Sequence, residues 1–355
     1  MTSALDSAAF AARIQGVLDD FVAEQADRLA PLGPDAAALL AEARASVSGG
    51  KRFRAAFCYW GYRSLAGGST DESALLRACA ALEVLHASAL VHDDLMDASA
   101  TRRGRPSTHV AFAAAHRREG WTGDPEQYGA AAAILLGDLL LSWADELLRR
   151  CGLPLDRVAR ALDVFDLCRS EVIAGQFLDV SVQARGSADV ETAMTVLRYK
   201  SAKYSIERPL HIGAALAGAT DVQLAELSAF GLPLGEAFQL RDDQLGVFGD
   251  PATTGKPAGD DLVEGKRTVL VALAMDGAAS PARDRLDQAL GTSLGASEVE
   301  ELRRIIIDSG AHDQVEAVID ELTRLSVDAL ERAALDETAR AALRELAEAA
   351  TQRSL

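Results

Sequence analysis

Apolar and polar residues along this chain recur with the period of an α-helix, and glycine or proline interrupts the pattern. The segment DAAALLAEARASVSGG predicts a helix that begins at Asp35 and ends at Gly49 and Gly50. Further helices are expected near 53–66, 71–98, 126–151, 154–184, 189–218 and 221–248. Amphipathic helices are expected to fill residues 267–355, and no segment sustains the two-residue period of a strand. The pattern predicts an all-α fold, with residues 1–355 in a single helical domain.

Composition narrows the class of protein. A chain of 355 residues that is 49% hydrophobic can bury a large core, and its net charge of −17 argues against a nucleic-acid partner. Four cysteines without pairing or metal spacing are expected to be reduced core residues of a cytoplasmic protein. The most apolar stretch, YGAAAAILLGDLLLSW, meets Asp138 after about ten residues, too few to span a membrane. We therefore expect no transmembrane segment.

Three carboxylates end the predicted helix that contains LEVLHASALVHDDLMD. Asp93 and Asp97 are four residues apart and share one helix face, with Asp94 turned about 100° away. A solvated acidic helix end is the ordinary interpretation of such a group. However, like charges at this spacing repel by roughly 0.2–0.5 kcal/mol, and the C-terminus of a helix is itself partly negative. A hard divalent cation, which prefers oxygen ligands, would offset both effects.

A second acidic group closes another predicted helix. It consists of Asp242, Asp243 and Asp250 in FQLRDDQLGVFGD. The next segment, GDPATTGKPAGDDLVEGK at 249–266, is rich in glycine, proline and charge and predicts a mobile loop. Two acidic groups at helix ends, if they face each other across a cavity, could share metal ions and hold a diphosphate.

Basic residues accompany both acidic groups. GGKRFR is expected to place Lys51 and Arg54 in the first turn of a helix, where cations oppose the helix dipole unless an anion binds there. A solvated basic turn is the alternative. Further basic residues are Arg102 and Arg103 in TRRGRP, Lys200 in RYKSAKYS, and Lys256 and Lys266 in the predicted loop. Together they indicate phosphates bound directly and through metal ions.

Taken together, these motifs resemble those of one family. GGKRFR, HDDLMD followed by RRG, GQFLD, YKS, FQLRDD and GKPAGDDLVEGKRT occur in the order and rough spacing of the trans-prenyl diphosphate synthases, over about residues 45–270. The set is most similar to that of geranylgeranyl diphosphate synthases and their short-to-medium-chain relatives. The resemblance implies an isoprenoid-synthase helical barrel around a deep central cavity, and a homodimer. It also implies head-to-tail addition of isopentenyl diphosphate to dimethylallyl, geranyl or farnesyl diphosphate.

The resemblance further implies a role for each motif residue. Three Mg²⁺ ions per active site would be held by Asp93, Asp97 and Asp242. The diphosphate of isopentenyl diphosphate would be bound by Lys51, Arg54, His86 and Arg103, although His86 without the motif would be interpreted as a core histidine. The allylic diphosphate would be bound by Arg102, Lys200 and Lys256, with Lys266 closing the loop over it. Gln239 would orient metal-bound water, and Gln176 and Asp179 would line the cavity wall. The predicted catalytic residues among these are Asp93, Asp97, Arg102, Lys200 and Asp242.

Two positions depart from the family pattern. The second aspartate motif is usually DDxxD, and its fifth position here is Gly246. This predicts weaker support for the third metal ion rather than inactivity. Ser201 follows Lys200 where the family usually has threonine, which keeps the hydroxyl.

Product length is expected to depend on small residues before the first aspartate motif. Ser88 and Ala89 precede Asp93 by five and four positions and are expected to lie one turn deeper on much the same face. In the family, an aromatic residue at either position stops chain growth early. Here the tail is expected to pass and to stop near Leu85 or Trp143, which gives a twenty-carbon main product. The alternative is that Ser88 and Ala89 are small only to let helices pack closely.

The expected mechanism is ionisation of the allylic C–O bond. Metal ions and basic groups would stabilise the charge on the leaving diphosphate, and an apolar cavity would shelter the allylic cation from water. Three other functions stay open: a terpene cyclase of the same fold, a non-catalytic subunit of a heteromeric synthase, and a plain helical scaffold. Gly246 is the one sequence feature that favours the non-catalytic subunit.

Overall fold

The computed structural model describes residues 6–66, 71–187, 189–249 and 259–351. Contacts divide the chain into two compact units. Unit 1 contains residues 1–162 and 212–218, and unit 2 contains residues 163–211 and 219–355. The prediction of a single domain stays a prediction.

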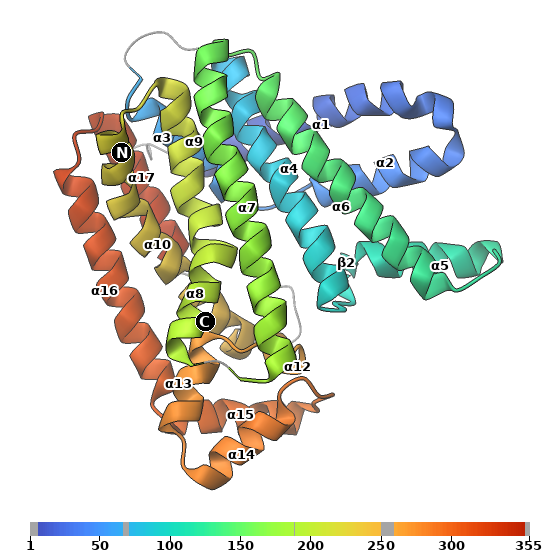
Figure 1. The fold of residues 1–355 in the computed structure, drawn as a ribbon, viewed down its shortest axis with the longest axis vertical. Coiled ribbons are helices and arrows are strands. Elements are labelled where there is room, and N and C mark those ends of the chain that lie inside the picture. The colour runs from blue at the N-terminus through green and yellow to red at the C-terminus, as the bar shows by residue number, and fades with distance from the viewer. Residues whose placement is uncertain (1–5, 67–70, 188, 250–258, 352–355) are drawn as a thin grey trace. The chain divides into compact units, whose positions relative to one another are not determined.

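Unit 1 is built from helices and one short hairpin (Figure 1). Its elements are α1 (Ser7–Leu29), η1 (Ala30–Leu32), α2 (Pro34–Ser46), α3 (Phe53–Arg63), α4 (Glu72–Met96), β1 (Thr101–Arg102), β2 (Arg105–Pro106), α5 (Thr108–Glu119) and α6 (Pro125–Arg149). Helix α7 (Leu155–Arg185) begins in unit 1 and continues in unit 2, and α9 (Arg208–Ala217) begins in unit 2 and ends in unit 1. The predicted helices are therefore present, with ends shifted by a few residues.

Helix α4 is the central helix of unit 1 and packs against α1, α3 and α6 (Figure 1). Its start is set by Asp71, whose side chain accepts a hydrogen bond from the Ala74 amide at 3.1 Å. Within the described residues, α4 alone is long and apolar enough to cross a membrane by length and composition, but most of its apolar window is buried inside the protein. A core helix of a globular protein has the same composition.

Residues 101–106 form a short hairpin, although the sequence pattern predicts no strand. Strands β1 and β2 pair antiparallel, with Thr101 opposite Pro106 and Arg102 opposite Arg105. The two residues between them, Arg103 and Gly104, have φ values of 52° and 72°. Positive φ at both central residues is what a two-residue hairpin needs to match the twist of its strands. The expectation of no strands is therefore wrong at this position.

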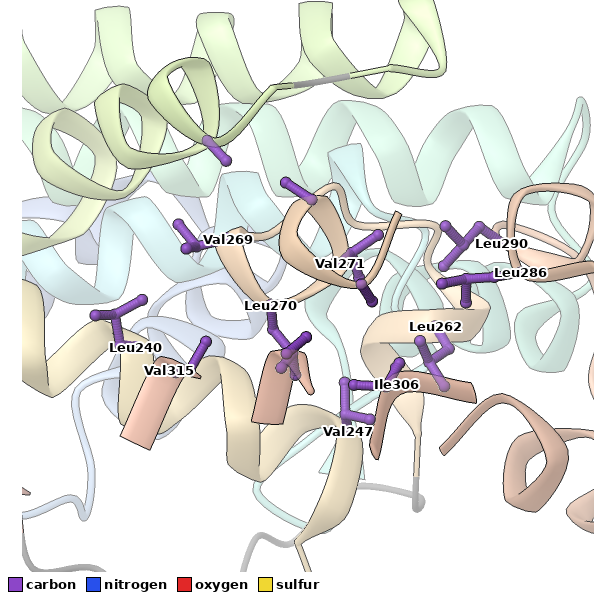
Figure 2. Packing of buried hydrophobic residues seen from close by; sticks show 14 of the residues in the cluster. Leu240, Val247, Leu262, Val269, Leu270, Val271, Leu286, Leu290, Ile306 and Val315 are labelled. Atoms are coloured by element: carbon purple, nitrogen blue, oxygen red, sulfur yellow. The ribbon is translucent and has the colours of Figure 1, made fainter. Parts of the chain in front are cut away.

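Unit 2 contains the remaining helices. They are α8 (Val190–Leu197), η2 (Arg198–Glu207), α10 (Asp221–Phe248), α12 (Asp260–Val263), α13 (Val269–Gly277), α14 (Ser280–Ala289), α15 (Ala296–Asp308), α16 (Ala311–Arg332) and α17 (Glu337–Thr351). A hydrophobic cluster joins several of them, and Figure 2 shows Leu240, Val247, Leu270, Ile306 and Val315 gathered in it. This cluster anchors the C-terminal half of α10, the helix that carries the second acidic group.

The four cysteines are all buried and free, as predicted. Burial raises the pKa of the Cys79 and Cys151 thiols, so both stay protonated at neutral pH.

Candidate active site

The first acidic group lies at the C-terminal end of α4. The helix ends at Met96, and the amide of Asp97 donates to the carbonyl of Asp93 at 2.8 Å, so Asp97 caps the helix. Asp94 is turned inward and buried. Arg102 donates from Nε to Asp94 Oδ1 at 2.8 Å and lies 3.6 Å from Asp93 Oδ2. The charge of Asp94 is thus offset within the protein, which separates its role from that of Asp93 and Asp97.

A basic cluster surrounds His86, two turns earlier on α4. The pKa of the His86 imidazole lies well below its usual value, first because the ring is desolvated and then because of the charges on Arg54, Arg103, Arg102 and Arg52. His86 is therefore neutral at pH 7. Desolvation, followed by the charge of Arg52, also lowers the pKa of Arg103. Four guanidinium groups this close disfavour one another until an anion binds among them. Unit 1 therefore brings Arg54 and Arg103 close to His86, an arrangement whose charge suits an anion.

The residues of GGKRFR differ in part from the expectation. Helix α3 begins at Phe53, so Arg54 lies in its first turn as predicted. Lys51 lies before the helix and is exposed, so its predicted place in the first turn is wrong. The reason is Arg52, which caps the helix in the left-handed conformation at φ 56° and prevents the helix from starting earlier.

The second acidic group lies in unit 2, near the end of α10. Gln239 donates to Asp243 Oδ1 at 2.8 Å and accepts a hydrogen bond from the Ser201 hydroxyl. Burial and the nearby charge of Asp261 raise the pKa of Asp243 to about 8. Gln239 thus connects Asp243 to the helix that carries Lys200, and its predicted role toward metal-bound water stays a prediction. Asp250 and Lys256 lie outside the described residues.

Gly246, the departure from the family pattern, lies against Asp261 of α12. A Cβ atom at position 246 would overlap the Asp261 carboxylate. Lys266 Nζ lies 3.4 Å from Asp261 Oδ1 and 2.5 Å from Glu264 Oε2. The Asp261 carboxylate thus lies beside position 246, where the usual aspartate of the motif is missing.

Lys200 lies in a π-helical segment, η2, which α7 and α10 contact closely. Its Nζ is 2.6 Å from Asp179 Oδ2 of α7. A Cβ at Gly175 would overlap the backbone of Lys200, and a Cβ at Gly235 would overlap the backbone of Ala202. The two glycines therefore let the helices approach η2 closely. Segments of π-helix occur often at functional sites.

Two of the predicted chain-length residues, Ser88 and Ala89, lie on different faces of α4. Ser88 is buried, and its hydroxyl donates to the Gly137 carbonyl of α6 at 2.7 Å. Five residues correspond to about 140° around a helix, so Ser88 does not share the face of Asp93 as expected. Ala89 lies four residues before Asp93 and is partly exposed.

The two residues expected to stop the tail are both core residues of unit 1. Leu85 is buried, and Trp143 packs edge-on against Phe21 of α1 with ring centroids 5.9 Å apart. Any role for them in chain length stays a prediction.

The carboxylates fit a hard divalent cation by their chemistry. Asp93, Asp97 and Asp242 offer only oxygen donors, which Mg²⁺ prefers. Among the residues that the structure describes, no three His, Cys, Asp or Glu side chains converge as metal ligands. A bound diphosphate would supply further oxygen donors of the kind that Mg²⁺ prefers.

Comparison with known protein families shows to which family this chain belongs. The profile of the polyprenyl synthetase family matches residues 37–306. The chain belongs to the polyprenyl synthetase family. It is 34% identical over 273 residues to geranylfarnesyl diphosphate synthase of Aeropyrum pernix, covering 76% of this chain and 79% of that one. It is 33% identical over 286 residues to geranylgeranyl diphosphate synthase of Mycobacterium tuberculosis, covering 80% and 75% of the two chains.

Solved structures agree with this membership. Geranylgeranyl pyrophosphate synthase from Corynebacterium glutamicum, complexed with isoprenyl diphosphate and magnesium, superposes with a TM-score of 0.96 at 39% identity and covers 99% of this chain and 100% of that one. This polyprenyl synthetase therefore has the all-α isoprenoid-synthase fold and is a trans-prenyltransferase of isoprenoid biosynthesis.

Sequence reasoning missed several residues and contacts near the predicted site residues of each unit. They are Arg52, Glu83 and Asp261, together with the Lys200–Asp179 ion pair. Arg52 and Asp261 stand inside the motifs, and Glu83 is an acid within an apolar stretch of its helix, which was the available signal.

Proposed function

We propose that this polyprenyl synthetase adds isopentenyl diphosphate to allylic diphosphates and makes geranylgeranyl diphosphate as its main product. The observation that supports this best is the basic cluster around His86. It places neutral His86 and four arginines beside a helix end with two aspartates. A cluster of this composition suits the charged head group of a diphosphate substrate.

The roles of the individual residues belong to the same proposal. The diphosphate of isopentenyl diphosphate is bound by Lys51, Arg54, His86 and Arg103. The allylic diphosphate is bound by Arg102, Lys200, Lys256 and Lys266. Arg102 and Lys200 are held by Asp94 and Asp179 in the structure. When the allylic substrate binds, Arg102 and Lys200 must therefore either leave these carboxylates or contact the carboxylate and the diphosphate at the same time.

The cofactor is three Mg²⁺ ions, which Asp93, Asp97 and Asp242 would hold. Bound there, the ions would neutralise charge on the leaving diphosphate. The protein itself contributes the orientation of the carboxylates. Arg102 keeps Asp94 turned inward, and Gln239 fixes Asp243 beside Asp242. We expect Asp93→Ala to lower turnover by at least ~10²–10³, the usual effect of losing one key charge-stabilising group.

The enzyme is also proposed to be a cytoplasmic homodimer. Four buried, free thiols are typical of a reducing compartment. Ile134 and Leu135 lie exposed on adjacent positions of α6, which favours a protein partner over that helix.

The test is incubation of the purified protein with isopentenyl diphosphate, each allylic diphosphate and Mg²⁺, with products identified by mass. A twenty-carbon diphosphate is the expected product, and chelation of the metal should abolish it. Cyclic hydrocarbons from a supplied twenty-carbon diphosphate would indicate a terpene cyclase instead. If no substrate is consumed, the chain is a non-catalytic subunit or a scaffold.

A further inference from the structure

One arginine of the basic cluster in unit 1, Arg52, forms a buried ion pair with Glu83. Arg52 Nη1 lies 3.2 Å from Glu83 Oε2, and the two side chains are only 3% and 4% exposed. Arg52 comes from the turn before α3, and Glu83 lies one turn before His86 on α4. Neither residue belongs to the set that is proposed to touch substrate.

Each partner also holds backbone of the turn between α2 and α3. Arg52 Nη2 donates to the Val47 carbonyl at 2.6 Å and to Gln15 Oε1 of α1 at 2.5 Å. The other oxygen of Glu83 accepts the Ala55 amide at 3.0 Å, at the N-terminus of α3. One buried pair thus fixes both ends of the segment that contains Lys51 and Arg54.

Arg103 holds the same turn from the side of the hairpin. Its Nη1 donates to the Ser48 carbonyl at 2.7 Å. A Cβ at Gly50 would lie 3.1 Å from Arg103 Nη2, and Gly50 has φ 92°, which only glycine adopts readily. Two guanidinium groups therefore hold consecutive carbonyls of one turn.

This arrangement is costly as a means of stabilising a fold. Removing two charges from water often costs more than their attraction returns, so apolar residues of similar volume would serve the core at least as well. Arg52 also adopts φ 56°, a conformation that non-glycine residues rarely take. Strained backbone of this kind persists where the surroundings over-determine it, and it clusters at binding sites.

We propose that Arg52 and Glu83 are positioning residues for isopentenyl diphosphate: together they hold residues 47–55 so that Lys51, Arg54 and Arg103 converge on its diphosphate. This inference rests on the proposed function. Glu83 also places one negative charge behind several guanidinium groups, which lowers their mutual repulsion before the substrate arrives. The allylic substrate does not depend on this turn.

The decisive variant is Glu83→Gln, which keeps the side chain's shape and removes its charge. We expect the KM for isopentenyl diphosphate to rise about tenfold or more, because small misplacement of binding groups has large effects. The KM for farnesyl diphosphate should stay within about twofold of the wild-type value, as expected for lost binding of one substrate only. Calorimetric titration with isopentenyl diphosphate alone should show the same weakening. Equal changes for both substrates, or no change for either, would overturn the proposal.

Glu146→Gln is the matched control in the same unit. Glu146 also joins α1 to a core helix, because it accepts from Gln25 at 3.1 Å and from Arg28 at 2.6 Å. This variant should leave both KM values within about twofold of wild type. A selective rise for isopentenyl diphosphate in the control as well would mean that the effect comes from general loosening of α1, against the proposal.

Gln15→Met decides the question if Glu83→Gln does not fold. Gln15 Oε1 accepts from both Arg52 and the Gly49 amide, and its loss leaves the ion pair intact. We expect a smaller but equally selective rise in the KM for isopentenyl diphosphate, and an unchanged value would contradict the proposal. Wild-type protein that condenses no substrates would instead refute the proposed function, so the two failures are distinguishable.

Discussion

Phenylalanine at Ala89 should shorten the product of this enzyme, whereas phenylalanine at the adjacent Ser88 should mainly destabilise it. The two residues differ in what surrounds them. Ser88 is 2% exposed and donates to the Gly137 carbonyl of α6. Ala89 is partly exposed and lies on the side of α4 that carries Asp93.

The expected cost at Ser88 follows from these contacts. Losing the hydrogen bond to Gly137 costs about 1 kcal/mol. Forcing a ring between packed α4 and α6 costs about 1–3 kcal/mol more. The sum, about 2–4 kcal/mol, is a large part of the 5–15 kcal/mol by which proteins are typically stable. At Ala89 the ring extends away from the packed interface, so the loss in stability should be much smaller.

Thermal denaturation and product analysis by mass separate the two effects. Ala89→Phe should keep a melting temperature near that of wild type and shift the main product from twenty carbons toward fifteen, with the first condensation nearly unchanged. Ser88→Phe should melt several degrees lower. A wild-type melting temperature for Ser88→Phe would refute the packing of α4 on α6 described above. An unchanged product distribution in folded Ala89→Phe would show that the tail runs elsewhere.

Three further predictions concern binding, the second acidic group and acid stability. Arg54→Ala should raise the KM for isopentenyl diphosphate more than that for the allylic substrate, and an equal rise in steady-state measurements would contradict the division of the cations. Gly246→Asp restores the family spacing but must displace the Asp261 carboxylate, so turnover should fall roughly tenfold; increased turnover would show that the neighbouring carboxylate is no substitute. His211 has its pKa lowered to about 4, mainly by burial, so the unfolded chain binds the proton first as the pH falls below about 6.5. The free energy of unfolding should therefore decrease by up to about 3 kcal/mol between pH 6.5 and pH 4, and urea denaturation of His211→Gln should show a smaller decrease.

The sequence alone determined the class of fold, most helices and the family, whereas the roles of the site residues stay predictions. Helical periodicity is a local property, so α6, α7 and α10 could be placed to within a few residues. The motifs were recognisable because metal and diphosphate binding require particular side chains at particular spacings, such as the spacing of Asp93 and Asp97, for which metal binding stays a prediction.

Only the tertiary structure decided which residues far apart in the sequence form ion pairs and pack against each other. Sequence could not show that Arg52 adopts the left-handed conformation with its side chain paired to Glu83, because Glu83 is 31 residues away in the chain. It could not show that Ser88 faces α6. The faces of α4 have similar composition, and only the folded structure shows which helix packs on each face. Nor could the sequence show that Asp261 lies against Gly246, because the two residues belong to different segments and meet only when the chain is folded.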